Sequence, residues 1–214
     1  MPTWEPARLR QPLFARVADL IDRIANEPDW PTIDRLNAAF ALDELRLVEA
    51  SKTKPALAPD GTIDPLTLYE VRIVSLGEIP TRPRNAHDLL NALIWAAFPR
   101  SKLALTRTLA AIQRDRAAGR ATLPATRTRA HDRLALVDEG AVLCVGASQW
   151  IFGHAILEHA YAGERAVRGA AVDLDVDLAG IDPIAARAAV DQAFAAADLD
   201  RVVRTGPGIA VSER

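Results

Sequence analysis

The hydrophobic pattern is strongest over residues 85–98, where from Leu89 onward only Asn91 is polar. This pattern predicts a helix that is buried on nearly all sides. Pro99 then stops it. Apolar residues at helical spacing predict further helices over residues 12–26, 32–41, 102–118, 149–161 and 183–197. Ser101 and Asp182 are the expected N-caps of two of these helices.

Strand patterns are fewer. Leu66–Leu76 is rich in β-forming side chains, and Val167–Leu178 alternates between apolar and polar positions. Leu134–Val137 and Ala141–Val145 flank Asp138-Glu139-Gly140. This arrangement predicts a β-hairpin with its turn at the acidic pair.

Helices and strands do not alternate regularly along the chain, so a doubly wound parallel sheet is not expected. We predict an α+β fold in which a helical N-terminal part packs on a small, mainly antiparallel sheet. A single domain is expected over residues 1–204, with an irregular connection over 51–65 and a flexible C-terminal tail over 205–214.

Composition narrows the class of protein. Of the 214 residues, 50% are hydrophobic and 25% are charged, as is typical of globular proteins. A single cysteine, Cys144, excludes an intrachain disulfide, and the net charge of −2 is not that of a polycation built for nucleic acid. The first residues lack a signal-peptide pattern, and no apolar run approaches the ~20 residues of a membrane-spanning helix. We therefore expect a cytoplasmic protein with no membrane partner, whose oligomeric state stays open.

The helix predicted over 85–98 carries polar residues near its start. His87 and Asn91 are four residues apart and therefore lie about 40° apart on one helix face. Buried imidazole and amide groups need hydrogen-bond partners, so the fold must supply polar groups to both. Asp88 has a local interpretation, because Asn85 at the N-cap and Asp88 three residues later resemble a capping box.

His154 and Glu158 form a second pair with the same spacing in an apolar stretch. Three interpretations stay open for this pair. The two residues could be metal ligands, a histidine–carboxylate dyad for proton transfer, or a structural hydrogen bond.

If the two helices meet, His87, Asn91, His154 and Glu158 form one polar cluster in apolar surroundings, and these are the candidate catalytic residues. In an enzyme, His154 would be the base and Glu158 its orienting partner. The candidate metal ligands are His87, Asp88, His154 and Glu158, so the expected cofactor is either none or a divalent metal. The His87-Asp88 doublet invites comparison with metal-dependent phosphohydrolases, but no histidine precedes His87 in this chain.

Arg82, Arg84 and Lys102 flank the same helix and, with its positive N-terminal end, could bind an anion. The leading functional hypothesis is a hydrolase or acid/base enzyme that acts on a small anionic substrate, with Arg84 as the anion clamp. The alternative is a non-catalytic interaction protein whose polar network only specifies packing.

A basic segment supports a third hypothesis, a nucleic-acid binder. Residues 113–133 hold six arginines against two aspartates, a local net charge of +4 that could contact phosphates. No aromatic residue occurs between Phe98 and Trp150, so the segment has no base-stacking platform. A solvated surface is therefore favoured over nucleic acid. The six arginines are Arg114, Arg116, Arg120, Arg127, Arg129 and Arg133.

Three motifs resemble a known family. The long stretch from Gly77 to Lys102 is similar to the bacterial domain-of-unknown-function family 3025, and the shorter stretches 133–140 and 152–158 resemble its later motifs. The resemblance spans roughly Tyr69 to Leu178. It implies a cytoplasmic bacterial protein and supplies no activity.

Overall fold

The structure is a computed structural model that describes residues 3–50, 55–164, 167–199, 203–204 and 208–211. In this part of the chain the α-helices are α1 (Ala18–Ile21), α2 (Ile33–Phe40), α3 (Tyr69–Leu76), α4 (Ala86–Ala97), α5 (Pro99–Ala117), α6 (Arg129–Gly140), α7 (His154–Tyr161) and α8 (Pro183–Ala195). The strands are β1 (Arg46–Glu49), β2 (Glu78–Thr81), β3 (Ala141–Val145), β4 (Ser148–Ile151), β5 (Arg168–Asp173) and β6 (Ile209–Ala210). The described residues also form the short 3-10 helices η1 (Pro6–Arg10), η2 (Pro12–Val17) and η3 (Pro65–Thr67). The predicted α+β class is confirmed.

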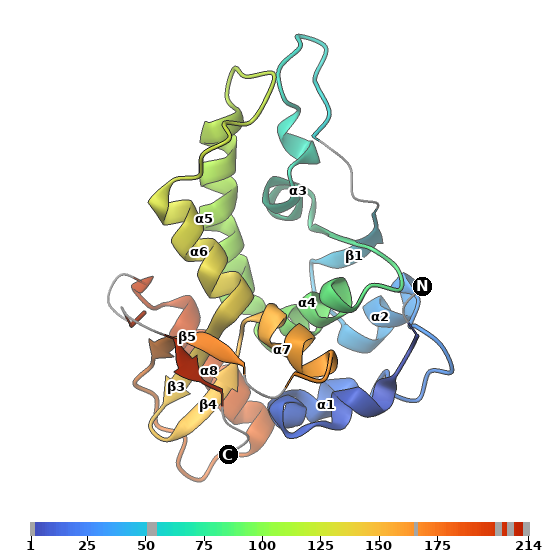
Figure 1. Cartoon of the computed structure of the whole chain (residues 1–214), viewed down its shortest axis with the longest axis vertical. Helices are drawn as coiled ribbons and strands as arrows, with labels where there is room; N and C mark the ends of the chain where they lie inside the picture. Colours follow the sequence, from blue (N-terminus) through green and yellow to red (C-terminus); the bar gives the residue numbers. More distant parts are fainter. Residues whose placement is uncertain (1–2, 51–54, 165–166, 200–202, 205–207, 212–214) are drawn as a thin grey trace.

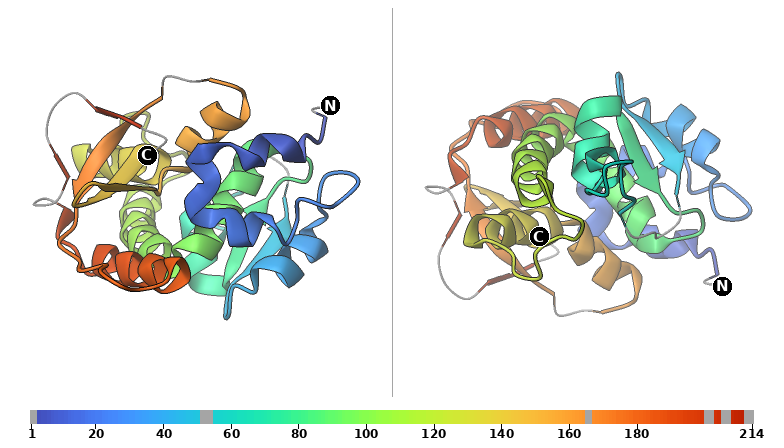
Figure 2. Two further views of the ribbon diagram at one scale, coloured as in Figure 1. Left: turned by 90° about the horizontal axis from the view of Figure 1, so that it is seen from below. Right: turned by 90° about the horizontal axis from the view of Figure 1, so that it is seen from above.

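Helices α3, α5 and α6 rise as an arm above a broader base (Figure 1). On one side of the base lie α8 and the sheet that contains β3, β4 and β5, and on the other lie α2 and β1. Seen from above, α5 lies between α3 and α6, and seen from below, the N-terminal helical segments cross over α4 and α7 (Figure 2). The arm and the base therefore meet at α4 and α7.

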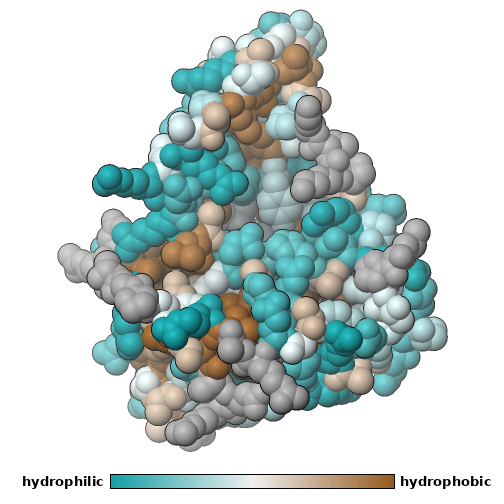
Figure 3. All heavy atoms as spheres, in the orientation of Figure 1, coloured by the Kyte–Doolittle hydropathy of each residue, from teal (hydrophilic) through white to brown (hydrophobic). Residues whose placement is uncertain are grey.

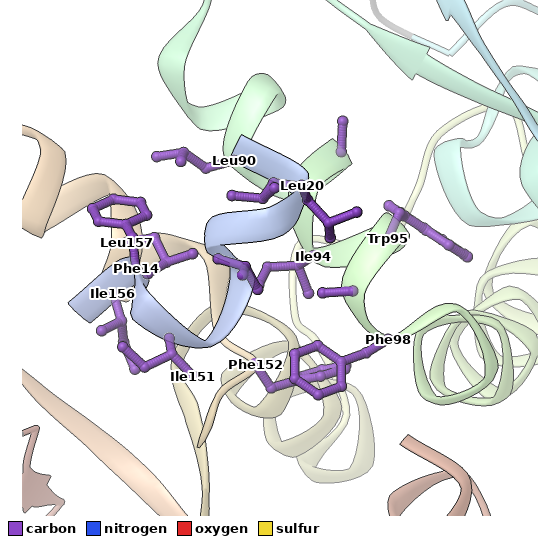
Figure 4. Packing of buried hydrophobic residues seen from close by; sticks show 14 of the residues in the cluster. Phe14, Leu20, Leu90, Ile94, Trp95, Phe98, Ile151, Phe152, Ile156 and Leu157 are labelled. Carbon is purple, nitrogen blue, oxygen red and sulfur yellow. The ribbon is translucent and has the colours of Figure 1, made fainter. Parts of the chain in front are cut away.

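Helix α4 forms the centre of the core and confirms the strongest prediction. The Asn85 side chain accepts a hydrogen bond from the Asp88 N–H and caps the helix. Ile94 and Trp95 are both fully buried; Ile94 lies on the side of α4 that faces α1 and α7, whereas Trp95 points away from these helices (Figure 4). Each buried leucine, isoleucine or phenylalanine contributes about 1.5–3 kcal/mol. This packing holds the first turn of α4, which carries His87, in a fixed position.

The predicted sheet was mainly antiparallel, and the structure corrects this to a mixed sheet. In the order β4-β3-β5-β6, strands β3 and β4 are antiparallel, as are β5 and β6, whereas β3 and β5 are parallel. The reason is that the chain reverses direction twice between β3 and β5, once at β4 and once in the segment that contains α7, so β5 runs parallel to β3. A separate parallel pair, β1 and β2, was not predicted.

The remaining helix predictions are confirmed with shifted ends. The Thr32 and Asp182 side chains cap α2 and α8. Over 12–26 the chain forms η2 and the short α1. Ser101 is not an N-cap, because α5 already begins at Pro99 and the Ser101 N–H donates to the carboxylate of Asp191 in α8 at 2.8 Å. A carboxylate from another helix thus satisfies the free N–H groups at this helix start.

The strand predicted over Leu66–Leu76 is wrong, because this segment forms η3 and α3. Val71 packs against α5 in a small second core within the arm, while Ile73 joins the main core. Burial on two sides at helical spacing overrides the β-propensity of these residues. Gly77 ends the helix with a φ of 68°, and a side chain there would meet the carbonyl oxygen of Glu44 at 2.7 Å.

The hairpin predicted around Asp138-Glu139-Gly140 is also wrong. These residues close α6, and β3 pairs instead with β4. The helix predicted over 149–161 therefore begins late, at His154. Just before it, a Cβ at Gly153 would lie 2.5 Å from the carbonyl oxygen of Glu139. Glycine at this position lets the start of α7 touch the end of α6.

Two segments lie partly outside the described residues. Residues 51–54 of the irregular connection predicted over 51–65 are outside the described part of the chain. The same is true of residues 205–207 and 212–214 of the predicted C-terminal tail. Ile209 and Ala210 of the predicted tail pair with β5. Among the described residues, no helix combines the length and the apolar character needed to cross a membrane.

Candidate functional site

Three helix ends meet where the arm joins the base: the start of α4, the start of α7 and the end of α6. They bring together His87, His154, Asp138 and Glu139, and Glu158 joins them from one turn further along α7. Figure 3 shows a surface that is hollowed between α6 and α3, with hydrophilic side chains around the lower end of the hollow. We call His87, His154 and Glu139 the histidine cluster.

His154 is the buried member of the cluster, with a side chain 3% exposed. Its Nδ1 lies 3.0 Å from the carbonyl oxygen of Asp138. A carbonyl only accepts, so Nδ1 carries the proton and Nε2 keeps a free lone pair. Burial, with a further effect of the nearby Lys102 charge, lowers the pKa of His154 to about 4. The ring is therefore neutral at pH 7.

His87 is the accessible member, with a side chain 32% exposed. Its Nδ1 lies 2.8 Å from the Glu158 carboxylate, which fixes the proton on Nδ1 in the same way. The Nε2 atoms of His87 and His154 are then 3.1 Å apart, and the rings meet edge to face at 77°. When both rings are neutral, their two lone pairs face each other, and a proton or a cation between them would stabilise this contact.

Glu139 completes the histidine cluster. One of its carboxylate oxygens lies 3.3 Å from His154 Nε2. One ligand atom from each of the three residues lies within 4.8 Å of the others. Desolvation raises the pKa of Glu139, and the negative charges of Asp138 and Glu158 act in the same direction. The cluster therefore presents two imidazole nitrogens and one carboxylate to a common point.

A buried lysine, Lys102, holds a residue that contacts the histidine cluster. Lys102 is 2% exposed, and its Nζ donates to Asp138 Oδ1 at 2.6 Å and to Asn91 Oδ1 at 2.8 Å. The Asn91 amide in turn donates to the Tyr69 hydroxyl at 2.9 Å. Lys102 thus holds Asp138, whose backbone carbonyl fixes the ring of His154.

The structure brings most of the predicted site residues together. His87, His154 and Glu158 are in direct contact, but Glu158 orients His87 and not His154. Asn91 lies one turn beyond His87 and reaches the cluster only through Lys102. Asp88, a predicted metal ligand, accepts three hydrogen bonds from Arg82.

The cations expected to form an anion pocket are each paired with a carboxylate. Arg82 pairs with Asp88, Arg84 with Asp29, and Lys102 with Asp138. The partner of Arg84, Asp29, lies in the N-terminal part of the chain, before α2.

Sequence reasoning missed Glu139 and the role of Asp138. Both fall in Asp138-Glu139-Gly140, whose composition is that of a turn and predicts a hairpin. A helical interpretation of 129–140, with Thr128 as its N-cap, would have placed both residues at a helix end.

Several arginines of the 113–133 segment hold the arm together. Arg114 donates to the Ser75 hydroxyl, Arg116 to the carbonyl oxygens of Pro124 and Thr126, and Arg120 to carbonyl oxygens at the end of α5. These contacts give the arginines a structural role within the arm.

A cavity of about 330 Å³ lies away from the histidine cluster, between α5, α6 and α8. It borders none of the three cluster residues. Its walls are mainly apolar, and Leu105, Leu134 and Phe194 are among them.

One segment of the chain matches a known protein family, and this segment contains most of the site residues. Residues 58–150 match the model of a family described as a protein of unknown function, DUF3025. The matched segment is less than half of the chain. It includes His87, Asn91, Lys102, Asp138 and Glu139, whereas the motif at 152–158 follows it. No curated protein and no solved structure matches the chain. The DUF3025 description names no activity, so the function must be argued from the geometry.

Proposed function

We propose that this protein is a hydrolytic enzyme whose reaction centre is the histidine cluster. The observation that carries the proposal is the 3.1 Å approach of two Nε2 atoms whose rings are both fixed by acceptors at Nδ1. Such preorganised lone pairs can polarise a water molecule and accept its proton. In a purely structural pair of neutral rings, an N–H of one ring would donate to the other ring, and the two Nδ1 acceptors work against this arrangement.

Each residue has a distinct part in the proposed chemistry. Glu158 orients the accessible ring of His87. When His87 takes a proton, the Glu158 carboxylate stabilises the resulting imidazolium. His154 stays neutral and offers a second lone pair from the buried side. Glu139, with its raised pKa, can pass a proton to a leaving group.

The proposal concerns a small substrate that reaches the surface edge formed by His87 and Glu139. Their side chains are 32% and 49% exposed, so the reaction centre is open to solvent. Because Arg82, Arg84 and Lys102 are all neutralised by carboxylates, their positions do not support the earlier expectation of an anionic substrate.

The test is a hydrolysis assay with a panel of chromogenic carboxylic esters, phosphate esters and amides. We expect one class to be hydrolysed, and we expect His87→Gln and Glu139→Gln to lower kcat/KM by about 100-fold or more. His159→Gln is the matched control, since His159 lies on the same helix as His154 but is paired with Glu164 at the surface. If His87→Gln and Glu139→Gln both keep the kcat/KM of the wild type, or if no substrate class is hydrolysed, the proposal is contradicted.

A further inference from the structure

We propose that His87, His154 and Glu139 bind one divalent transition-metal ion, with Zn²⁺ the ion that suits hydrolysis. The inference rests on the proposed function and changes its chemistry in one respect: with the ion bound, His87 and Glu139 would be ligands, and the ion would replace His87 as the group that activates the attacking water. The three ligand atoms are His87 Nε2, His154 Nε2 and a carboxylate oxygen of Glu139.

The spacing of the two imidazoles fits a shared ion. With metal–nitrogen bonds of about 2.0–2.1 Å, two ligand nitrogens lie about 3.0 Å apart at a right angle and about 3.4 Å apart at the tetrahedral angle. The observed distance between the Nε2 atoms is 3.1 Å. Moderate movement of the half-exposed Glu139 side chain would bring its oxygen into the same coordination sphere.

The partners behind the ligands match those of histidines that bind metals. A metal-binding imidazole commonly donates its other N–H to a carboxylate or a backbone carbonyl, which sets the tautomer and the ring orientation. His87 has the Glu158 carboxylate in this position, and His154 has the carbonyl of Asp138. Both rings are therefore already held in the form that coordinates an ion.

Charge also favours a cation at this point. Glu139, Glu158 and Asp138 surround the two rings, and Lys102 neutralises one of these three carboxylates, Asp138. A divalent ion would balance the excess of carboxylates and would remove the repulsion between the facing lone pairs. Glu158 and Asp138 already hold the imidazole and lysine groups, so Glu139 is the carboxylate that completes the ligand set.

Three protein ligands leave a coordination position for water, which is the pattern of catalytic zinc sites and differs from that of closed structural sites. The exposed edges of His87 and Glu139 place this position toward solvent. A zinc-bound water has a pKa near 7 and is a strong nucleophile at neutral pH.

The test is metal binding to chelator-treated, dialysed full-length protein. Titration with Co²⁺, followed by its visible absorption, and calorimetry with Zn²⁺ should both show one equivalent bound. We expect His87→Ala to weaken the affinity by at least about 100-fold, and Glu158→Gln, which removes only an outer partner, by about 10–100-fold. His159→Ala is the control and should bind like wild type. Circular dichroism checks that each variant is folded.

Different experimental results would contradict the metal site and the proposed hydrolytic function. Hydrolysis that persists at full rate in the chelated protein, or the absence of saturable binding by wild type, would overturn the metal site. Binding that does not change in His87→Ala would also overturn it. One equivalent of bound metal without hydrolysis of any substrate class would support the metal site and contradict only the proposed function.

Discussion

Replacement of Lys102 by methionine should lower the free energy of unfolding by about 3–5 kcal/mol. Lys102 is almost fully buried, and it neutralises Asp138 and satisfies the amide oxygen of Asn91. Methionine preserves much of the packing against Trp95 and Phe152 but removes the charge. The carboxylate of Asp138, only 22% exposed, would then lack its partner. Urea denaturation of the two proteins measures the difference.

The control for this change is Arg107→Met, which removes a cation from an exposed position of the same helix. Its expected effect is within about 0.5 kcal/mol. Adding Asp138→Asn to Lys102→Met should recover part of the lost stability, because no unpaired charge then remains. A loss for Lys102→Met as small as that of Arg107→Met would show that the buried ion pair does not support the site.

The metal-free protein should lose about 3 kcal/mol of stability between pH 6.5 and pH 4 because of His154 alone. The folded protein holds the pKa of His154 at about 4, mainly through burial, whereas the unfolded chain binds the proton near pH 6.5. The contribution of His154 to the free energy of unfolding is therefore complete above pH 6.5, falls as the pH drops toward 4, and is constant below that value.

The measurement is urea denaturation at several pH values in the presence of a chelator, with His154→Asn as the comparison. The asparagine amide can replace the Nδ1–H donor to Asp138 without titrating. The variant should show a shallower loss of stability over this range, while His159→Gln should follow wild type. Equal slopes in wild type and His154→Asn would contradict the neutral state of the buried ring.

Helix α4 shows what could be predicted from sequence. Its apolar residues lie on nearly all sides, and Asn85 has the character of an N-cap, so local pattern and tertiary packing agree. The same pattern placed His87 at the helix start. The contact of His87 with His154 followed as a hypothesis, because polar groups in two buried helices need partners.

The features that the sequence does not predict depend on contacts between segments far apart in the chain. Residues 66–76 have β-forming side chains, but packing of α3 against both cores makes them helical. Asp138 and Glu139 have turn composition but end a helix, and only the close approach permitted by Gly153 places Glu139 beside His154. The pairing of Glu158 with His87 could not be read from the spacing of His154 and Glu158, since that spacing shows only that they share a helix face.

The central claim is that the rings of His87 and His154 are both protonated at Nδ1 and present their Nε2 lone pairs to one another. Long-range ¹H–¹⁵N NMR of the imidazoles, in chelator-treated protein at pH 8, tests it directly. The chain has four histidines, and His87→Gln and His154→Asn assign the relevant signals. We expect both Nε2 atoms to be unprotonated and both Nδ1 atoms to be protonated. A proton on Nε2 of either ring would contradict the account.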